Sequence, residues 1–284
     1  MREQQRVAPE SIRLLTPAVR ALLWIAGALV FLAGVQLFVF SERTEDLFAW
    51  TIDVPLTAAF LGAGYGASVA FEWLAAREQA WANARVALPS VFLFTTLTLV
   101  TTLIHLDLFH LDQTFSSSAR AAAWGWLAIY TTVPIALAIV LTLQIRAPGT
   151  DPPRSAPLPT GLRALLAIQA ALMLSIGLYL LVWPEQAASL WAWPLTPLTG
   201  RAVGAWVLSI GLTAAHVLLE NDARRARVAA VPYVALGLLQ LVALGRYLDT
   251  VAWGEVQASV YLLSVVSMPI TGLALLRLQS KMVG

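Results

Sequence analysis

Long apolar runs constrain what this chain can fold into more than any other feature. A helix that crosses a lipid bilayer needs about 20 mostly apolar residues. Eight runs of about that length occur, at residues 19–40, 55–75, 86–106, 124–145, 164–182, 202–219, 229–246 and 257–277. They are continuous, whereas the strands of an outer-membrane barrel alternate apolar and polar residues. The sequence therefore predicts an all-α integral membrane protein with eight transmembrane helices.

Composition excludes several other classes of protein. Apolar residues make up 59% of the chain and charged residues only 12%, about half the charged fraction of a soluble domain. A soluble enzyme and a disordered chain are therefore excluded. The net charge is only +2, so a nucleic acid is not expected as a partner. Because the chain has no cysteine, it contains neither disulfides nor thiolate metal ligands.

The basic residues are distributed unevenly over the segments between the runs. All 18 Lys and Arg residues except Arg43, Arg120, Arg201 and Arg246 fall in segments on the same side as the N-terminus. Short loops rich in Lys and Arg stay in the cytoplasm. The pattern predicts that both termini are cytoplasmic, which requires an even number of spans and so agrees with eight.

An internal repeat divides the chain into two halves. Residues 47–50, Leu-Phe-Ala-Trp, recur as Leu-Trp-Ala-Trp at 190–193. Gly62-Ala63 recurs as Gly204-Ala205, and residues 84–87, Ala-Arg-Val-Ala, recur at 226–229. Because each half contains four spans, both halves have the same orientation in the membrane, as parallel repeats do. We expect two four-helix bundles packed side by side.

The repeat sets the expected domain organisation. Residues 1–18 form a cytoplasmic N-terminal segment, and residues 19–145 form the first four-helix repeat. Residues 146–162 contain five prolines, which keep a segment extended, and we interpret them as a cytoplasmic linker. Residues 163–284 form the second repeat.

The second half resembles a known family. It reads Leu-Val-Trp-Pro-Glu at residues 181–185, followed by an outer loop and an Arg201-x-x-Gly204 entry into a glycine-rich span. Over about residues 164–279 this pattern resembles the small bacterial DoxX-like four-helix membrane proteins. In the first half, Ala59 or Phe60 stands where Arg201 would align. The whole chain also resembles functionally unassigned multi-pass proteins of high-GC bacteria. The resemblance implies paired four-helix bundles in a bacterial inner membrane, but no settled activity.

The densest polar run lies at the outer end of the third span. It contains His105, Asp107, His110 and Asp112. Imidazole and carboxylate groups are ligands of divalent metals such as zinc, iron or manganese, so a metal site or a metal-dependent enzyme is one interpretation. On a continuous helix, however, only Asp107 and His110 are close neighbours. We favour a polar helix end with Asp–His hydrogen bonds.

Tryptophans form a second group at the outer side. It includes Trp50, Trp183, Trp191, Trp193 and Trp253, together with Phe48. Indole rings gather at the level of the lipid headgroups, which is the simpler explanation. The alternative is an aromatic mouth over a cavity that binds a lipophilic or quinone-like ring.

Arg201 and Arg246 also lie at the outer ends of spans, where a charge must reach water or a partner. We expect them to form ion pairs with Asp249, Glu185 or Glu255. The alternative is contact with an anionic headgroup or ligand. The candidate ligand-binding residues are therefore Arg201, Trp193, Trp191, Trp50, Arg246 and Asp249.

Ionisable residues are expected to avoid the middle of the membrane. No Asp, Glu, Lys or Arg falls at the centre of a predicted span, and Glu72 is placed near the inner end of the second. Ion-coupled transporters usually carry such groups at mid-depth, so the pattern argues against that class.

These features favour a non-enzymatic protein. The first hypothesis is the binding or movement of a hydrophobic or amphiphilic small molecule. The second is a structural or accessory subunit of a larger membrane complex, and the third is the metal-dependent enzyme. The expected partners are membrane lipids, a lipophilic small molecule, and other membrane subunits or a second copy of the chain.

Overall fold

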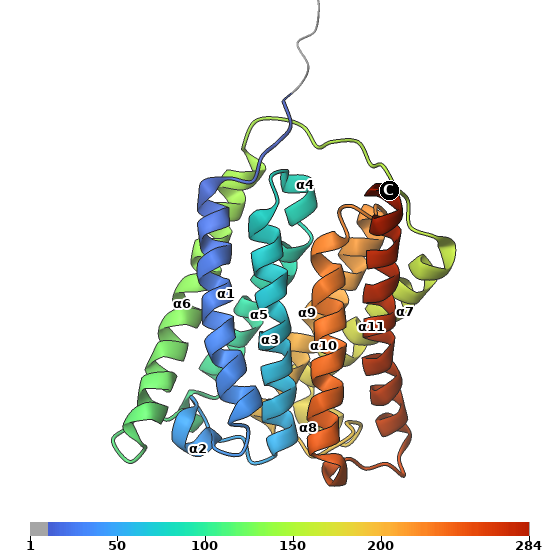
Figure 1. The fold of residues 1–284 in the computed structure, drawn as a ribbon. Coiled ribbons are helices and arrows are strands. Elements are labelled where there is room, and N and C mark those ends of the chain that lie inside the picture. Colours follow the sequence, from blue (N-terminus) through green and yellow to red (C-terminus); the bar gives the residue numbers. More distant parts are fainter. Residues whose placement is uncertain (1–10, 284) are drawn as a thin grey trace, which may run out of the picture.

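The computed structural model describes residues 11–283, which form a bundle of long helices (Figure 1). Eight helices of 18 or more residues run along the bundle: α1 (Pro17–Val39), α3 (Pro55–Arg77), α5 (Ala87–Ile104), α6 (Ser117–Ile145), α7 (Thr160–Val182), α9 (Pro197–Glu220), α10 (Arg227–Arg246) and α11 (Val256–Val283). Short helices connect them: α2 (Thr44–Leu47), α4 (Trp81–Ala84), η1 (Leu106–Leu108), α8 (Pro184–Ala188) and η2 (Leu248–Thr250). Within the described residues the fold is all-helical, as expected.

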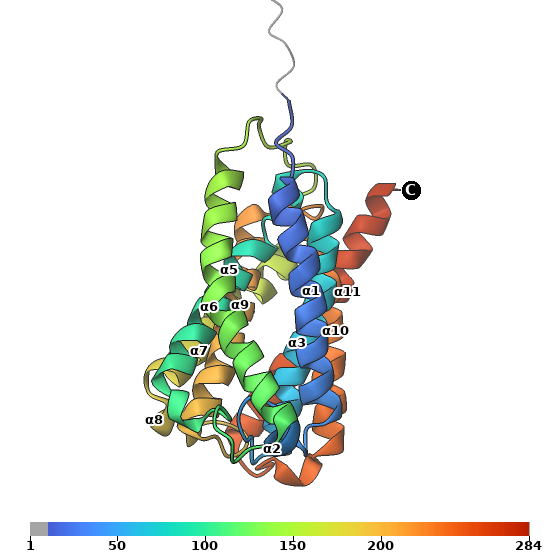
Figure 2. The same cartoon turned by 90° about the vertical axis from the view of Figure 1, so that its left-hand side faces the viewer.

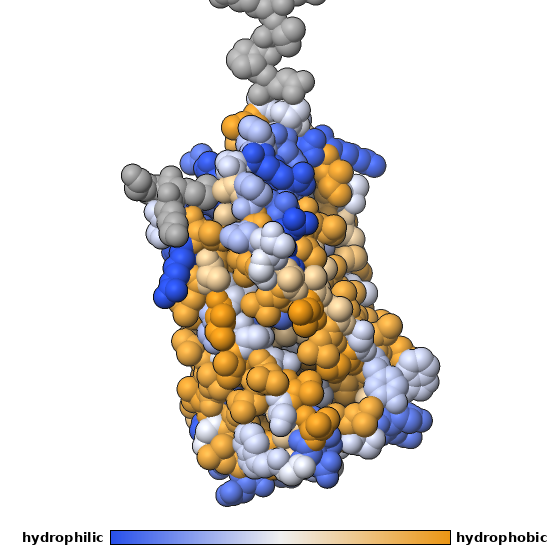
Figure 3. Space-filling view, turned by 90° about the vertical axis from the view of Figure 1, so that its right-hand side faces the viewer, coloured by the Kyte–Doolittle hydropathy of each residue, from blue (hydrophilic) through white to orange (hydrophobic). Residues whose placement is uncertain are grey.

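Seven of these helices, all but α3, are long and apolar enough to cross a membrane. The helix α3 has the same 23-residue length as α1, but three glycines, a tyrosine and Glu72 make it less apolar. Its residues are mostly buried inside the bundle. Apolar side chains cover the flank of the molecule, and hydrophilic ones gather at its two ends (Figure 3). The surface is that of a multi-pass membrane protein.

Most helices begin close to where the apolar runs predict. Proline occupies the first position of α1, α3 and α9, where its missing N–H costs nothing and its fixed φ suits the helix. The exception is α6, which begins at Ser117 rather than near residue 124. The Ser116 hydroxyl accepts a hydrogen bond from the Ala119 N–H at 3.0 Å, and this N-cap starts the helix within a polar stretch.

Within each half, the first and second long helices pack closely. The helix α1 packs against α3, and α7 packs against α9. A Cβ added at Gly62 would lie 2.4 Å from the Phe38 backbone nitrogen, and one added at Gly177 would lie 2.4 Å from that of Leu208. Only glycine allows the two backbones to approach so closely.

The second long helix of each half also packs against the third long helix of the other half. The helix α3 contacts α10, and α9 contacts α5. The two halves lie side by side (Figure 1), and these cross-contacts join them into one body. The loops match as well: the His110 N–H donates to the Ala49 carbonyl at 2.9 Å, and the Ala252 N–H donates to the Ala192 carbonyl at 2.9 Å.

The helix α1 begins, and α11 ends, at the same end of the bundle, which we call the terminal end (Figure 1). The Pro-rich linker crosses this end. It is fastened there, because the Asp222 carboxylate accepts hydrogen bonds from the backbone N–H groups of Ser155 at 2.6 Å and Ala156 at 3.1 Å. The opposite end carries α2 and α8, and we call it the α8 end.

Candidate functional site

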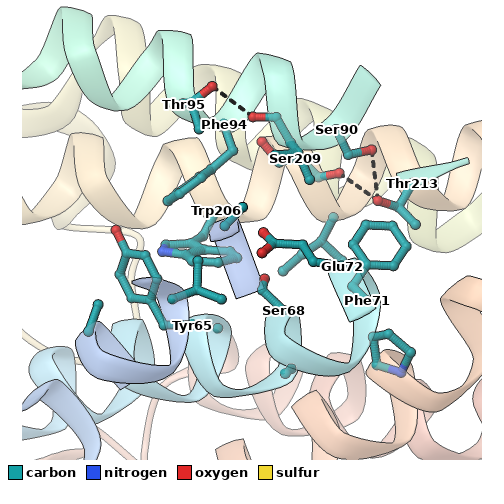
Figure 4. A pocket seen from close by; sticks show the side chains of 18 of the residues that line it. Tyr65, Ser68, Phe71, Glu72, Ser90, Phe94, Thr95, Trp206, Ser209 and Thr213 are labelled. Atoms are coloured by element: carbon teal, nitrogen blue, oxygen red, sulfur yellow. Dashed lines mark hydrogen bonds between the residues drawn. The ribbon is translucent and has the colours of Figure 1, made fainter. Parts of the chain in front are cut away.

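A cavity of about 130 Å³ lies between α1, α3, α5, α6, α9 and α10. We call it the central cavity (Figure 4). Its wall is mostly apolar and aromatic, with a small set of polar side chains, a combination typical of small-molecule sites. The aromatic residues include Tyr65, Phe71, Phe94, Trp206 and Tyr233. The polar ones include Ser68, Glu72, Ser90, Ser209 and Thr213.

Glu72 is the one charged residue among the described residues that line this cavity. Tyr65, Ser68 and Glu72 follow one another at spacings of three and four, so they share one face of α3, and that face is turned toward the cavity (Figure 4). Glu72 is 3% exposed, and its Oε2 atom is buried without a hydrogen-bond partner. It lies five residues before the end of α3, or roughly 8 Å along the helix axis. Glu72 lies near one end of α3, as expected, but its buried side chain faces the interior of the bundle.

Several hydroxyl groups line the same cavity as the Glu72 carboxylate. The Thr213 hydroxyl donates to Ser90 Oγ at 2.8 Å, and the Tyr65 and Tyr130 hydroxyls lie 2.6 Å apart. The hydroxyls of Ser209 and Tyr233 are buried without a partner. Because unpaired buried polar groups are costly, their gathering at one cavity marks a place that can hold a polar group of a ligand.

The central cavity is closest to the surface between α1 and α6. Leu29, Val30 and Ala33 on α1, and Ile129 and Val133 on α6, line it and are only half-buried. The lining residues from α10 are buried instead. Figure 2 looks onto the side that α1 and α6 frame. A lipophilic molecule can therefore approach the cavity laterally from the apolar surface.

A second cavity, of about 310 Å³, lies between α7, α8, α9, α10 and α11. We call it the α8 cavity. Trp191 lines it, and the Trp191 Nε1 atom is buried without a partner. Ile210 and Leu236 line both cavities, so the two spaces adjoin. Together they extend from the α8 end into the half of the bundle nearer the terminal end.

The structure separates the predicted tryptophan group. Trp193 packs beside Trp191, with ring centroids 5.2 Å apart, and its Nε1 donates to Thr57 Oγ1 at 2.8 Å across the two halves. Trp50 instead packs against Phe109 and Trp126, with centroids 5.1 and 4.9 Å apart. Of Trp50, Trp191 and Trp193, Trp191 lines one of these two cavities and the other two line neither.

The candidate arginines contact neutral groups. Arg201 donates to the Leu181 carbonyl at 3.2 Å and to His105 Nε2 at 2.7 Å. Burial and the adjacent Arg201 charge hold the pKa of His105 below its ordinary value. Arg246 donates to the Phe38 carbonyl and, at 3.0 Å, to Ser41 Oγ.

Within the described residues neither arginine lies within ion-pair distance of Asp249, Glu185 or Glu255. The expected ion pairs are therefore not formed, because backbone carbonyls and His105 already occupy the two guanidinium groups. Asp249, in η2, is exposed.

The histidine and aspartate run does not converge on one point. The helix α5 ends at Ile104, and His105 turns toward Arg201 while Asp112 is exposed. His110 is 1% exposed, with Nδ1 at 2.9 Å from the Phe48 carbonyl and Nε2 at 3.0 Å from Thr51 Oγ1. No three His, Asp or Glu residues among residues 11–283 are grouped so as to hold a metal ion, and Asp107 does not contact His110 as a helical neighbour would.

A cluster of ion pairs at the terminal end was not expected. Glu220 accepts from Arg85 Nε at 2.5 Å and from Arg225 Nη1 at 2.7 Å, and His216 Nε2 lies 3.5 Å away. Arg85 also pairs with Asp151 in the linker. The sequence signal was the Arg-rich stretch 224–227, whose arginines contribute to the Lys and Arg pattern that predicts orientation, although Arg225 is buried. The cluster joins α9, the linker and the start of α5.

Comparison with family models, curated proteins and solved structures finds no match to this chain. The two cavities are therefore the features of the molecule from which a function can be inferred.

Proposed function

We propose that this protein binds an amphiphilic small molecule in the central cavity and moves it between that cavity and the α8 cavity. The observation that carries the proposal is the central cavity itself: an apolar, aromatic space with unpaired buried polar atoms on Glu72, Ser209 and Tyr233. A binding site of this kind fixes one polar end of a ligand and accepts an apolar remainder.

The proposed route follows from the opening between α1 and α6 and from the positions of the two cavities. The half-buried residues of α1 and α6 give the central cavity an entry from the lipid. The α8 cavity lies toward the other end of the bundle, and only the shared residues Ile210 and Leu236 lie on the wall of both. Rotation of these two side chains would connect the spaces.

We further propose that all eight long helices span a bacterial inner membrane with both termini in the cytoplasm. The distribution of Lys and Arg supports this orientation. The common position of the start of α1 and the end of α11 supports an even number of spans.

Parallel repeats and a DoxX-like origin belong to the same proposal. Gly34 and Gly62 in the first half correspond to Gly177 and Gly204 in the second, and both pairs lie at close helix contacts. The matching loop hydrogen bonds from His110 and Ala252 add to this support.

The test of the binding proposal is a pair of phenylalanine substitutions on α1. Ala33→Phe places a ring in the opening of the central cavity, whereas Leu32→Phe, one residue earlier, changes a side chain that is 60% exposed on the outer surface. We expect native mass spectrometry of mildly extracted protein to detect a bound small molecule in the wild type and in Leu32→Phe. In Ala33→Phe its occupancy should fall at least tenfold.

Equal occupancy in both variants would contradict binding in the central cavity. A wild-type protein that carries no small molecule, and that instead co-elutes with other polypeptides at fixed stoichiometry, would make it an accessory subunit.

A further inference from the structure

We infer that the ligand of the central cavity carries a positive charge, with the Glu72 carboxylate as its counter-charge and the surrounding aromatic rings as its cage. The inference depends on the proposed function, since it names the chemical class of the ligand that the same cavity binds. It follows from the charge balance, the ring arrangement and the size of the site.

The Glu72 carboxylate has no partner of opposite charge in the wall of the cavity. An ionised carboxylate buried in an apolar interior is strongly unfavourable unless it is paired. None of the described residues that line the cavity is Lys, Arg or His. A ligand with a positive charge would supply the missing partner, while an anionic ligand would place two negative charges in one buried space.

The charged groups of the neighbouring helices are engaged elsewhere. On α9, His216 contacts Glu220. Arg85, which precedes α5, also contacts Glu220. On α1, Arg20 donates to the Glu78 carbonyl. Arg227, at the start of α10, is exposed at the terminal end. No residue of α5 is charged, and the only one in α6 is Arg120, near its start.

Aromatic rings pack together beside Glu72 in the wall of the central cavity. Phe94 and Trp206 have centroids 4.1 Å apart, and Tyr65 meets Trp206 edge-on at 5.0 Å. A Cβ at Gly64 would lie 2.9 Å from Trp206 Cδ2, so this glycine allows the indole to lie directly on α3. Aromatic faces attract organic cations, most strongly where water is excluded. The cage stands beside Glu72 in Figure 4.

The volume of the central cavity limits the size of the group that it can enclose. The cavity of about 130 Å³ is close to an engineered cavity of about 150 Å³ that binds benzene. The site therefore suits a compact organic ammonium group on a small ring or short chain. Any longer apolar part would extend through the opening between α1 and α6.

Binding of such a cation implies exchange with a proton. In the proposed exchange, a proton neutralises Glu72 while the ligand is absent, because an unpaired buried carboxylate is unfavourable. When the cation binds, the carboxyl group releases one proton to solvent, and the carboxylate pairs with the ammonium group. The remaining titratable groups that line the cavity are Tyr65 on α3, Tyr130 on α6 and Tyr233 on α10. They stay protonated near neutral pH, so one proton leaves for each cation bound.

Benzyltrimethylammonium and its neutral isostere neopentylbenzene test the inference. They have the same shape and differ in charge. Binding of each to the full-length protein in lipid nanodiscs is measured by equilibrium dialysis, with protein-free nanodiscs as the baseline. Proton release is measured by calorimetry in buffers of different ionisation enthalpy.

We expect the wild type to bind the cation with release of about one proton at pH 7, and more tightly as the pH rises. Glu72→Gln should bind the cation at least tenfold more weakly and neopentylbenzene unchanged. Glu255→Gln, which changes an exposed carboxylate, should behave as the wild type.

Two results overturn the inference alone. One is a wild-type protein that binds neopentylbenzene but not the cation, which leaves the proposed function intact. The other is equal cation binding by Glu72→Gln and the wild type. If the wild type binds neither compound, the inference and the proposed function both fail. The comparison of the two compounds in the wild type does not depend on the folding of any variant.

Discussion

The contacts that His105 and Glu72 make depend on residues from other helices, which the fold places next to them. His105 was a candidate metal ligand in the sequence. In the structure its Nε2 accepts a hydrogen bond from Arg201, which joins the end of α5 to the start of α9. Glu72 was predicted to lie near a helix end. In the structure it lines the central cavity together with Ser90, Ser209 and Tyr233. These residues lie on three other helices, and no local sequence pattern links them to Glu72.

The contact between His105 and Arg201 predicts a pH dependence of stability. The pKa of His105 is lowered from its ordinary 6.5 by burial and by the Arg201 charge, so the unfolded chain binds a proton more readily than the folded one. Stability is therefore complete above about pH 6.5 and falls as the pH drops through the lower pKa of the folded state. We expect the thermal midpoint in detergent to fall between pH 7 and pH 5.

The variant His105→Gln keeps an acceptor for Arg201 but does not titrate. Its thermal midpoint should fall less than that of the wild type over the same pH range. Identical pH profiles for the two proteins would contradict this role for His105.

At the scale of elements, apolar length predicted the helices well. The runs at 55–75 and 229–246 correspond to α3 and α10 with nearly the same bounds, because a continuous apolar segment of this length has one stable form in lipid. The first two turns of α6 were not predicted, because the residues at its start are polar or small and do not belong to the apolar run. The side of each helix that faces a cavity could not be predicted, because α3 is buried on nearly all sides and has no apolar stripe that points to one neighbour.

The close contact between α7 and α9 predicts that one added methyl group at Gly177 lowers the stability of the protein. Gly177→Ala would place a Cβ 2.4 Å from the Leu208 backbone nitrogen, so the two helices must separate. We expect a loss of about 1–3 kcal/mol, as is usual for overpacking, measured as a lower thermal midpoint in detergent.

Gly125→Ala on α6 is the matched control, because an added Cβ there meets nothing within 4 Å. It should leave the midpoint unchanged or raise it slightly, since alanine favours a helix over glycine. Similar midpoints for the two variants would show that the backbones of α7 and α9 do not need to approach so closely.

At the scale of the whole molecule, the orientation in the membrane can be tested directly, because the chain contains no cysteine. Ser155 in the linker at the terminal end and Ser189 after α8 are both exposed. We expect Ser155→Cys in whole cells to react only with a membrane-permeant thiol reagent, whereas Ser189→Cys also reacts with an impermeant one. The reverse pattern, or equal labelling of both by the impermeant reagent, would refute the proposed topology.

Because the two halves belong to one polypeptide, the number of buried acidic groups in a molecule need not be even. At the offset that relates Gly62 to Gly204, Glu72 corresponds to Ala214, which is fully buried. A dimer of identical four-helix subunits would carry this acidic group twice or not at all. One polypeptide that contains both halves permits an odd number, so under the proposed binding a molecule with a single Glu72 would exchange one proton for one cation.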